Sequence, residues 1–256
     1  RLPWLLLADR GVFLSTAGWS ISLADQVPRQ SFELPPSPKI LVIAPQPAGW
    51  GATGGQEHIA DLKELLENAD PSYLDDSRFK TVSTWTAFLT HLKSFQPDIL
   101  YYYGHGKGDR HTTRLVFEDD ASGDDEKPLA DIQTALQGTP GQPPLLAYIN
   151  CCQGDAGGLL GAGRQLSALV PAVVTNRTAA FISAARPQAI ALWEAVLLRG
   201  EPPHKAVSTM RGRLGDLGLS TADTRWMTPV VYGNYTEWRA HPPTPPSRLD
   251  RDPHWQ

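Results

Sequence analysis

The chain is poor in cysteine, with two cysteines among its 256 residues. These two, Cys151 and Cys152, are adjacent in the sequence. Neighbouring cysteines cannot build the disulfide framework of a small secreted scaffold, so a reducing, cytoplasmic compartment fits the composition better. We therefore expect the cysteines to serve packing or chemistry, not crosslinking.

Long apolar runs and basic runs are also lacking. No apolar run reaches the roughly 18 residues that a membrane span needs, and residues 2–7 lack the flanks of a signal peptide. The formal net charge of −4 gives no electrostatic footprint for nucleic acid. The apolar fraction of 41% is ordinary for a globular protein that buries one large core. Because the chain begins at Arg1 without a methionine, we expect it to be part of a longer protein.

Strand and helix patterns alternate along most of the sequence. Apolar runs predict strands at 40–44, 79–82, 98–103, 145–150, 171–175 and 229–232. Helical spacing predicts helices at 56–68, 84–94, 129–137, 159–169, 186–199 and 203–214. This alternation is typical of a mainly parallel sheet that helices cover on both faces.

The segments outside this pattern divide the chain. Residues 1–34 are expected to form a small hairpin or N-terminal appendage, which the proline-rich residues 35–38 separate from a main domain at 35–240. The tail at 241–256 is rich in proline and charge, and we expect it to be disordered.

Three further expectations concern the surface. The acidic run 118–126 is expected to be an exposed, solvated loop. The glycine-rich residues 49–55 are expected to form a loop near the cleft. Most histidines other than His105 are expected at the surface: His58, His91, His111 and His204.

Two of the predicted strands are followed by reactive side chains. His105 follows the strand at 98–103, and Cys152 follows the strand at 145–150. The carboxyl ends of parallel strands form the edge at which open α/β sheets bind ligands. A histidine and a cysteine that meet there can act as general base and nucleophile, and the small Gly106 amide can donate to an oxyanion. The sequence therefore predicts a cysteine protease.

Other interpretations of these residues stay open. Side chains alternate along a strand, so one of Cys151 and Cys152 should face the core and the other the cleft, and the pattern does not say which. The same alternation disfavours a metal site built from both thiols, and we expect no cofactor. Residues 104–108 lack Walker spacing, which disfavours nucleotide binding. A catalytically silent domain that binds proteins, and an α/β hydrolase, are the alternatives.

Three stretches, together with the His-Gly pair at 105–106, carry a family resemblance. Residues 2–6 resemble a "PWELL"-like opening segment with Leu5 in place of Glu, residues 149–154 an "L-(S/N)-A-C" strand, and residues 226–233 a "W-x-x-(F/P)-V-x-Y-G" strand. From residue 2 to about 234 the chain thus resembles the caspase-like cysteine proteases, and most of all the CHAT domain, which occurs fused to TPR repeats in bacteria. The resemblance implies a three-layer α/β/α caspase-like fold with a mostly parallel six-stranded sheet and a small N-terminal appendage.

The resemblance also implies residue roles. It makes Cys152 the nucleophile, with Cys151 in the small-residue position before it, and His105 the base. It assigns the oxyanion amides to Gly106 and Cys152. The residues that it implies for substrate binding are Asn150, Asp155, Asn176 and Arg177.

A cellular role is implied as well. The resemblance suggests an endopeptidase that cleaves a specific protein target without a cofactor. It suggests a regulated bacterial effector in defence or programmed cell death, which a sensor region or a partner protein activates.

Overall fold

The structure is a computed structural model that describes residues 8–9, 12–13, 22–23, 30–108, 113–119, 121, 123–151, 161–176, 182–216 and 228–243. The predicted site residues Cys152, Asp155 and Arg177 and most of the tail at 241–256 lie outside these ranges. Within the ranges, no helix has both the length and the apolar character needed to cross a membrane.

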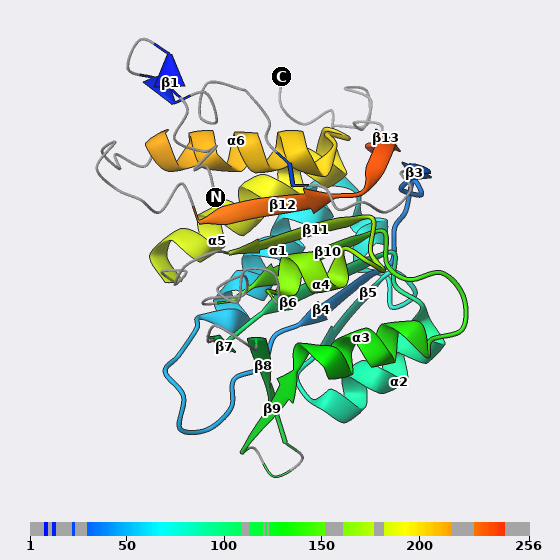
Figure 1. Cartoon of the computed structure of the whole chain (residues 1–256), viewed down its shortest axis with the longest axis vertical. Helices are drawn as coiled ribbons and strands as arrows, with labels where there is room; N and C mark the ends of the chain where they lie inside the picture. The colour runs from blue at the N-terminus through cyan, green and yellow to red at the C-terminus, as the bar shows by residue number, and fades with distance from the viewer. Residues whose placement is uncertain are drawn as a thin grey trace, which may run out of the picture.

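A six-stranded sheet forms the centre of the molecule, in the order β12-β11-β10-β6-β4-β5 (Figure 1). Its strands are β4 (Ile40–Ile43), β5 (Phe79–Val82), β6 (Ile99–Tyr103), β10 (Leu146–Asn150), β11 (Ala172–Asn176) and β12 (Pro229–Gly233). All neighbours run parallel except β12, which is antiparallel to β11. The prediction of a mostly parallel six-stranded sheet is confirmed, and each predicted strand end lies within one residue of the observed one. The agreement follows from burial, because strands covered on both faces are continuous apolar runs.

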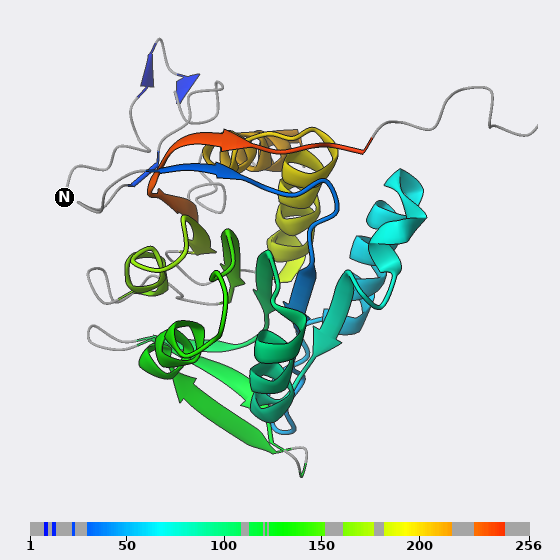
Figure 2. The same cartoon turned by 90° about the vertical axis from the view of Figure 1, so that its right-hand side faces the viewer.

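Helices cover the sheet on both faces (Figures 1 and 2). The α1 face is packed by α1 (Gly55–Ala69), α5 (Ile182–Trp193) and α6 (Pro203–Asp216). The α2 face is packed by α2 (Trp85–Phe95), α3 (Leu129–Gln137) and α4 (Ala162–Leu166). The result is a three-layer α/β/α arrangement. A π-helical segment, Glu194–Leu198, follows α5, and a 3-10 turn, Pro71–Leu74, follows α1.

Two predicted helices differ from the observed ones. Helix α5 begins at Ile182 and not at residue 186, so Pro187 lies inside it. A proline is favoured in the first turn of a helix and disfavoured in its interior, so its place inside α5 is not what sequence preference suggests. Helix α4 ends at Leu166, three residues before the predicted end.

Strand residues alternate between two buried clusters. Ile40 and Val42 of β4 pack on the α1 face, while Leu41 and Ile43 pack on the α2 face. The same alternation continues along β6 and β10, because successive strand side chains point to opposite sides. It therefore decides which face each residue at a strand end serves.

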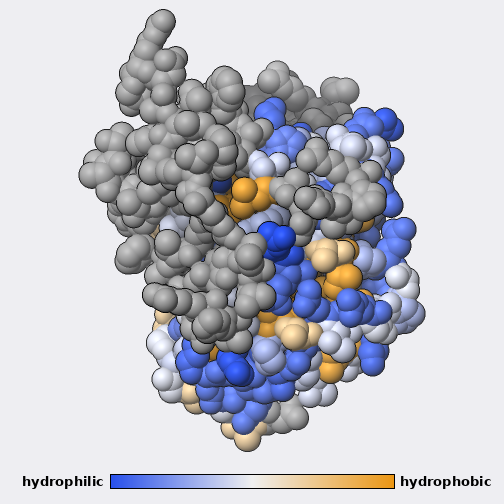
Figure 3. All heavy atoms as spheres, in the orientation of Figure 1, coloured by the Kyte–Doolittle hydropathy of each residue, from blue (hydrophilic) through white to orange (hydrophobic). Residues whose placement is uncertain are grey.

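A three-stranded antiparallel sheet stands beside the carboxyl edge of the main sheet. It consists of β7 (Gly106–Gly108), β8 (Thr113–Glu118) and β9 (Asp124–Pro128), and β8 and β9 project from the body as a hairpin (Figures 1 and 2). The expectation of a loop throughout 118–126 is wrong at both ends of the run: Glu118 belongs to β8, and Asp124, Asp125 and Glu126 belong to β9, which pairs with it. Hydrophilic side chains gather over this hairpin (Figure 3). A backbone ladder needs no apolar side chains, so the run carries no strand signal.

The remaining strands lie outside the central sheet. The two-residue strands β1 (Ala8–Asp9) and β2 (Val12–Phe13) pair antiparallel. Strand β3 (Gln30–Glu33) pairs with β13 (Tyr235–Arg239) in parallel. Neither β3 nor β13 was predicted. Their pairing joins the segment before the proline-rich break to the end of the main domain.

Candidate active site

The ends of β6 and β10 lie side by side at the carboxyl edge of the sheet. The two strands are parallel neighbours, and their register pairs Tyr103 with Asn150. His105 and Cys152 come two residues after these partners in the sequence. The structure describes His105 but not Cys152, so the register is the direct link between the two predicted site residues.

The imidazole of His105 is held by a backbone carbonyl. Its Nε2 atom lies 2.6 Å from the carbonyl oxygen of Gly51. A carbonyl oxygen can only accept, so Nε2 carries the proton and Nδ1 of the neutral ring keeps its lone pair. The ring also lies against the indole of Trp50, with 4.9 Å between ring centroids. The imidazole is thus oriented with Nδ1 as its basic atom.

The backbone at His105 is fixed by the neighbouring strand β8. The hydroxyl of Tyr102 shares its proton between the carbonyls of His105, at 2.6 Å, and Val116, at 2.7 Å. The amide of Val116 donates to the His105 carbonyl at 3.2 Å and to the Tyr102 hydroxyl at 3.0 Å. Burial raises the pKa of Tyr102 well above its ordinary value, so the hydroxyl keeps its proton.

Gly104 permits the tight turn before His105. A Cβ atom at this position would lie 3.0 Å from a side-chain carbon of Pro45 and 3.0 Å from the Tyr102 hydroxyl. A larger residue would therefore press on Pro45 and on the Tyr102 hydroxyl, which bonds to the His105 carbonyl, and would shift the imidazole.

The amide of Gly106 points away from β8. Gly106 faces Leu115 in the antiparallel register, and the bond from Val116 N to His105 O makes this a non-hydrogen-bonded pair. In such a pair the N–H and C=O groups point away from the partner strand. The Gly106 N–H is therefore directed to the side of β7 that faces away from β8.

Cys151 is a core residue. It is 2% exposed and packs in the apolar cluster on the α2 face. The sequence left open which of the two thiols faces the core, and the structure places that of Cys151 there. Cys152, together with Asp155 and Arg177, lies outside the described residues.

Asn150 and Asn176 form a buried amide pair on the α1 face. Asn176 Nδ2 donates to Asn150 Oδ1 at 2.9 Å, and Asn150 Nδ2 donates to the Tyr101 hydroxyl at 3.3 Å and the Ala185 carbonyl at 3.2 Å. Both side chains are 3% exposed or less. The pair links the ends of β10 and β11 to the start of α5.

His58 extends this network from α1. Its Nε2 atom lies 2.6 Å from the Tyr101 hydroxyl, which accepts from Asn150 and can donate its own proton to the imidazole. Burial lowers the pKa of His58 from 6.5 to about 4, so the ring is neutral near pH 7. The expectation that most of the other histidines lie at the surface is wrong for His58. This ring is buried, and the Tyr101 hydroxyl gives its Nε2 atom a hydrogen-bond partner.

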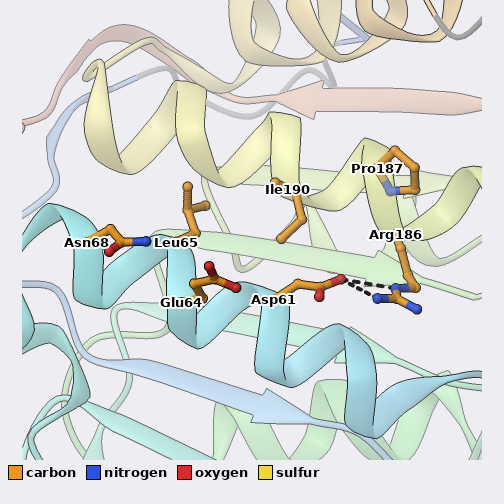
Figure 4. A pocket seen from close by; sticks show the side chains of 7 residues that line it. All are labelled: Asp61, Glu64, Leu65, Asn68, Arg186, Pro187 and Ile190. Carbon is orange, nitrogen blue, oxygen red and sulfur yellow. Dashed lines mark hydrogen bonds and ion pairs between the residues drawn. The ribbon is translucent and has the colours of Figure 1, made fainter.

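A groove of about 700 Å³ separates α1 from α5 (Figure 4). The ion pair between Arg186 and Asp61, at 2.5 Å, crosses one end of it, and Leu65 and Ile190 line its apolar part. None of the residues that line the groove is a predicted site residue. The groove is thus separate from the edge that holds His105.

In the described part of the chain, no group of three or more His, Cys, Asp or Glu residues is placed to hold a metal ion.

Two contributors to the site, Gly51 and Trp50, were not predicted as such. The sequence placed their glycine-rich loop near the cleft. Every residue has a backbone carbonyl, however, so the sequence does not reveal which carbonyl accepts a hydrogen bond.

Comparison with known proteins bears on the fold. No family model and no curated protein matches the chain. Solved structures with a similar fold include two crystal structures of the separase–securin complex from Saccharomyces cerevisiae and one of the Arg-specific cysteine proteinase gingipain R.

These similarities are structural, and sequence identity is low. The separase structures are 14% and 16% identical over 93% and 91% of this chain, with TM-scores of 0.52 and 0.54. Gingipain R is 12% identical over 87% of this chain, with a TM-score of 0.50. The chain spans 15% and 14% of the separase chains and 50% of the gingipain chain. Separase and gingipain R have caspase-like folds, and this chain has the caspase-like α/β fold that the resemblance predicted.

Proposed function

We propose that the chain is a cysteine endopeptidase in which Cys152 is the nucleophile and His105 the general base. The observation that carries the proposal is the register of β6 and β10, which brings the residues just before His105 and Cys152 side by side. The hydrogen bond from His105 Nε2 to Gly51 supports it, because Nδ1 is then left as the basic atom. Burial of Cys151 in the core supports the choice of the other thiol.

The proposed reaction needs no cofactor. His105 Nδ1 takes the proton of the Cys152 thiol, and the thiolate attacks the carbonyl carbon of the scissile peptide bond. The imidazolium then gives its proton to the leaving amine as the C–N bond breaks, which leaves a thioester on Cys152. Water hydrolyses the thioester and restores the thiol. The Gly51 carbonyl holds the ring in place through both proton transfers.

Two backbone amides are proposed to bind the oxyanion. The Gly106 N–H, directed away from β8, is one donor, and the Cys152 N–H is the other. We propose that the Asn150–Asn176 pair forms the floor of the substrate pocket, and that Asp155 and Arg177 contact the substrate.

The finer identity also belongs to this proposal. The resemblance of residues 2–6, 149–154 and 226–233 supports a CHAT domain. We propose a regulated bacterial effector in the cytoplasm, with 35–240 as its protease domain and a sensor region or partner protein as its activator. Gingipain R is a cysteine proteinase, and the structural similarity of this chain to it supports the proposed protease activity.

Mapping of new protein N-termini tests this function. The wild-type chain and Cys152→Ala are incubated with a bacterial proteome, with Cys151→Ala as the matched control. We expect new N-termini with the wild type and with Cys151→Ala, and none with Cys152→Ala. Cleavage that persists in Cys152→Ala contradicts the assignment, and a wild type that labels with thiol-directed peptides but cleaves nothing points to a binding domain.

A further inference from the structure

The loop that holds His105 is itself held by the β8–β9 hairpin. Residues 44–54 connect β4 to α1 and carry Gly51, whose carbonyl binds the imidazole. The loop turns through Gly49, at φ +84°, a backbone conformation that glycine adopts without strain. A loop with this freedom presents a carbonyl in one direction only if other contacts fix it.

Carboxylates of the acidic run supply such contacts. Glu118 accepts from the amide of Gln46, near the start of the loop, and from the hydroxyl of Ser83, each at 2.6 Å. Asp124 accepts from the indole Nε1–H of Trp50 at 3.2 Å. The expectation that this run is merely solvated is therefore wrong at both positions, because these side chains bind the loop.

Lys107 adds a contact on the face of the indole. Its Nζ atom lies 5.0 Å from the centroid of the Trp50 ring, and it is also paired with Glu126. Lys107 belongs to β7, which begins one residue after His105, and Glu126 belongs to β9. The indole thus lies among Lys107, Asp124 and the imidazole of His105.

We propose that Trp50 is a positioning residue for His105. Held by Asp124 and Lys107, its indole fixes the loop so that the Gly51 carbonyl accepts from Nε2 and the Nδ1 lone pair faces the nucleophile. The inference rests on the proposed function, in which Nδ1 takes the thiol proton. Each contact alone is weak at a solvent-exposed site. Together they converge on one side chain that adjoins both the carbonyl and the ring.

A direct contact between Trp50 and substrate is the competing explanation. It predicts that removing Asp124 has no effect on a reaction without substrate. A positioning role predicts that Asp124 and Trp50 act as one unit, so that loss of either partner of the Nε1–H bond has the same effect.

The first experiment reads the imidazole directly. Protein with ¹⁵N-labelled histidine is studied by NMR at a pH at which the His105 ring is neutral, and the His105 signals are assigned by comparison with His105→Asn. We expect the Nε2–H tautomer to dominate in the wild type and to give way to a tautomer mixture in Trp50→Ala, Trp50→Phe and Asp124→Ala. An unchanged His105 tautomer in all three variants overturns the proposal. Trp50→Phe keeps an aromatic ring, so the result does not depend on a variant that fails to fold.

Matched controls separate positioning from general loss of packing. Trp85→Phe makes the same change at a half-buried tryptophan, the first residue of α2, whose ring also lies beside a lysine, Lys127 of β9. Asp76→Ala removes an exposed carboxylate that pairs with Lys80. Both controls should keep the wild-type His105 signals. A shift of equal size in the controls overturns the proposal.

The second experiment measures alkylation of Cys152 by iodoacetamide, followed by peptide mass spectrometry. Because misplacing a catalytic group by about 1 Å can cost up to about a hundredfold, we expect Trp50→Ala to slow alkylation about tenfold. Trp50→Phe, Asp124→Ala and their double variant should show one smaller, common effect, because they break the same bond. Alkylation unchanged in all of these variants overturns the proposal. If His105→Ala also leaves alkylation unchanged, the proposed function fails, whereas the NMR result still decides the role of Trp50.

Discussion

The two buried faces of the central sheet use the same strands and pack different side chains. The α2 face is filled by aliphatic and aromatic groups such as Leu41, Leu100 and Phe117. The α1 face holds Tyr101 and Asn150, whose polar atoms bond to each other and to His58 from α1. Both faces are buried, so exclusion of water does not distinguish them. What distinguishes them is the kind of partner: on the α1 face the side chains of Asn150, Tyr101 and His58 bond to one another, whereas the Tyr102 hydroxyl on the α2 face bonds to backbone groups of His105 and Val116.

This difference explains how two adjacent residues at one strand end can serve different purposes. Asn150 joins the polar network on the α1 face, and Cys151 joins the apolar core on the α2 face. Strand alternation requires the opposite facing. The two faces can be tested separately, since each has residues whose loss affects one kind of interaction.

The largest effect is expected from the apolar face. Phe117→Ala removes a fully buried ring that packs against Trp85, Phe88 and Tyr102. We expect the free energy of unfolding to fall by about 3–5 kcal/mol, because a large cavity remains. Urea denaturation measures it. A loss below about 1 kcal/mol would show that the face is loosely packed.

A pH-dependent loss of stability is expected from His58 on the polar face. Its pKa is about 4 in the folded chain against an ordinary 6.5, so the unfolded chain binds the proton more tightly. Stability is therefore full above about pH 6.5 and falls as the pH drops towards 4, by up to about 3 kcal/mol. Denaturation of the wild type and of His58→Gln at several pH values measures the difference. Removing the exposed His241 by His241→Gln is the control, and equal pH profiles for the wild type and His58→Gln contradict the account.

Tyr101→Phe breaks the polar network at its centre without a large change in volume. The substitution leaves His58 Nε2 and one Asn150 N–H short of a partner. We expect a loss of about 1–3 kcal/mol, the cost of leaving buried polar groups unpaired. Thermal and urea unfolding measure it, and a gain in stability would show that the network is strained.

Cys151→Ala should have the smallest effect. The thiol is a buried core group, so its loss should cost about 1 kcal/mol. Labelling of the protein by thiol reagents under native conditions should stay unchanged. Loss of that labelling would show that Cys151, and not Cys152, is the reactive thiol.

Much of the fold could be predicted because apolar pattern and burial coincide in it. The central strands such as β6 and β10 are unbroken apolar runs, and α1 and α3 show helical spacing with clear ends. Strands β3, β9 and β13 lie outside the core sheet, and their charged or mixed residues carry no period. Their pairing partners are distant in the sequence or fixed by backbone bonds, which composition does not reveal.

The candidate site likewise contains residues that could be predicted from the sequence and residues that could not. Strand ends pointed to His105 and Cys152, since reactive side chains after buried strands are visible in the sequence. The Gly51 carbonyl and the contact of Asp124 with Trp50 were not predicted, because they depend on how a loop and a hairpin meet. The burial of His58 was missed for a similar reason, as its partner Tyr101 lies 43 positions away.

Labelling of Cys152 tests the central claim most directly. The wild type, His105→Ala and Cys151→Ala are treated with a thiol-reactive peptide inhibitor, and the modified peptide is identified by mass spectrometry. The account predicts rapid labelling of Cys152 in the wild type and in Cys151→Ala, and a loss of at least about a hundredfold in rate in His105→Ala. Equal labelling of Cys152 with and without His105 would contradict the pairing of the two strand ends as a catalytic dyad.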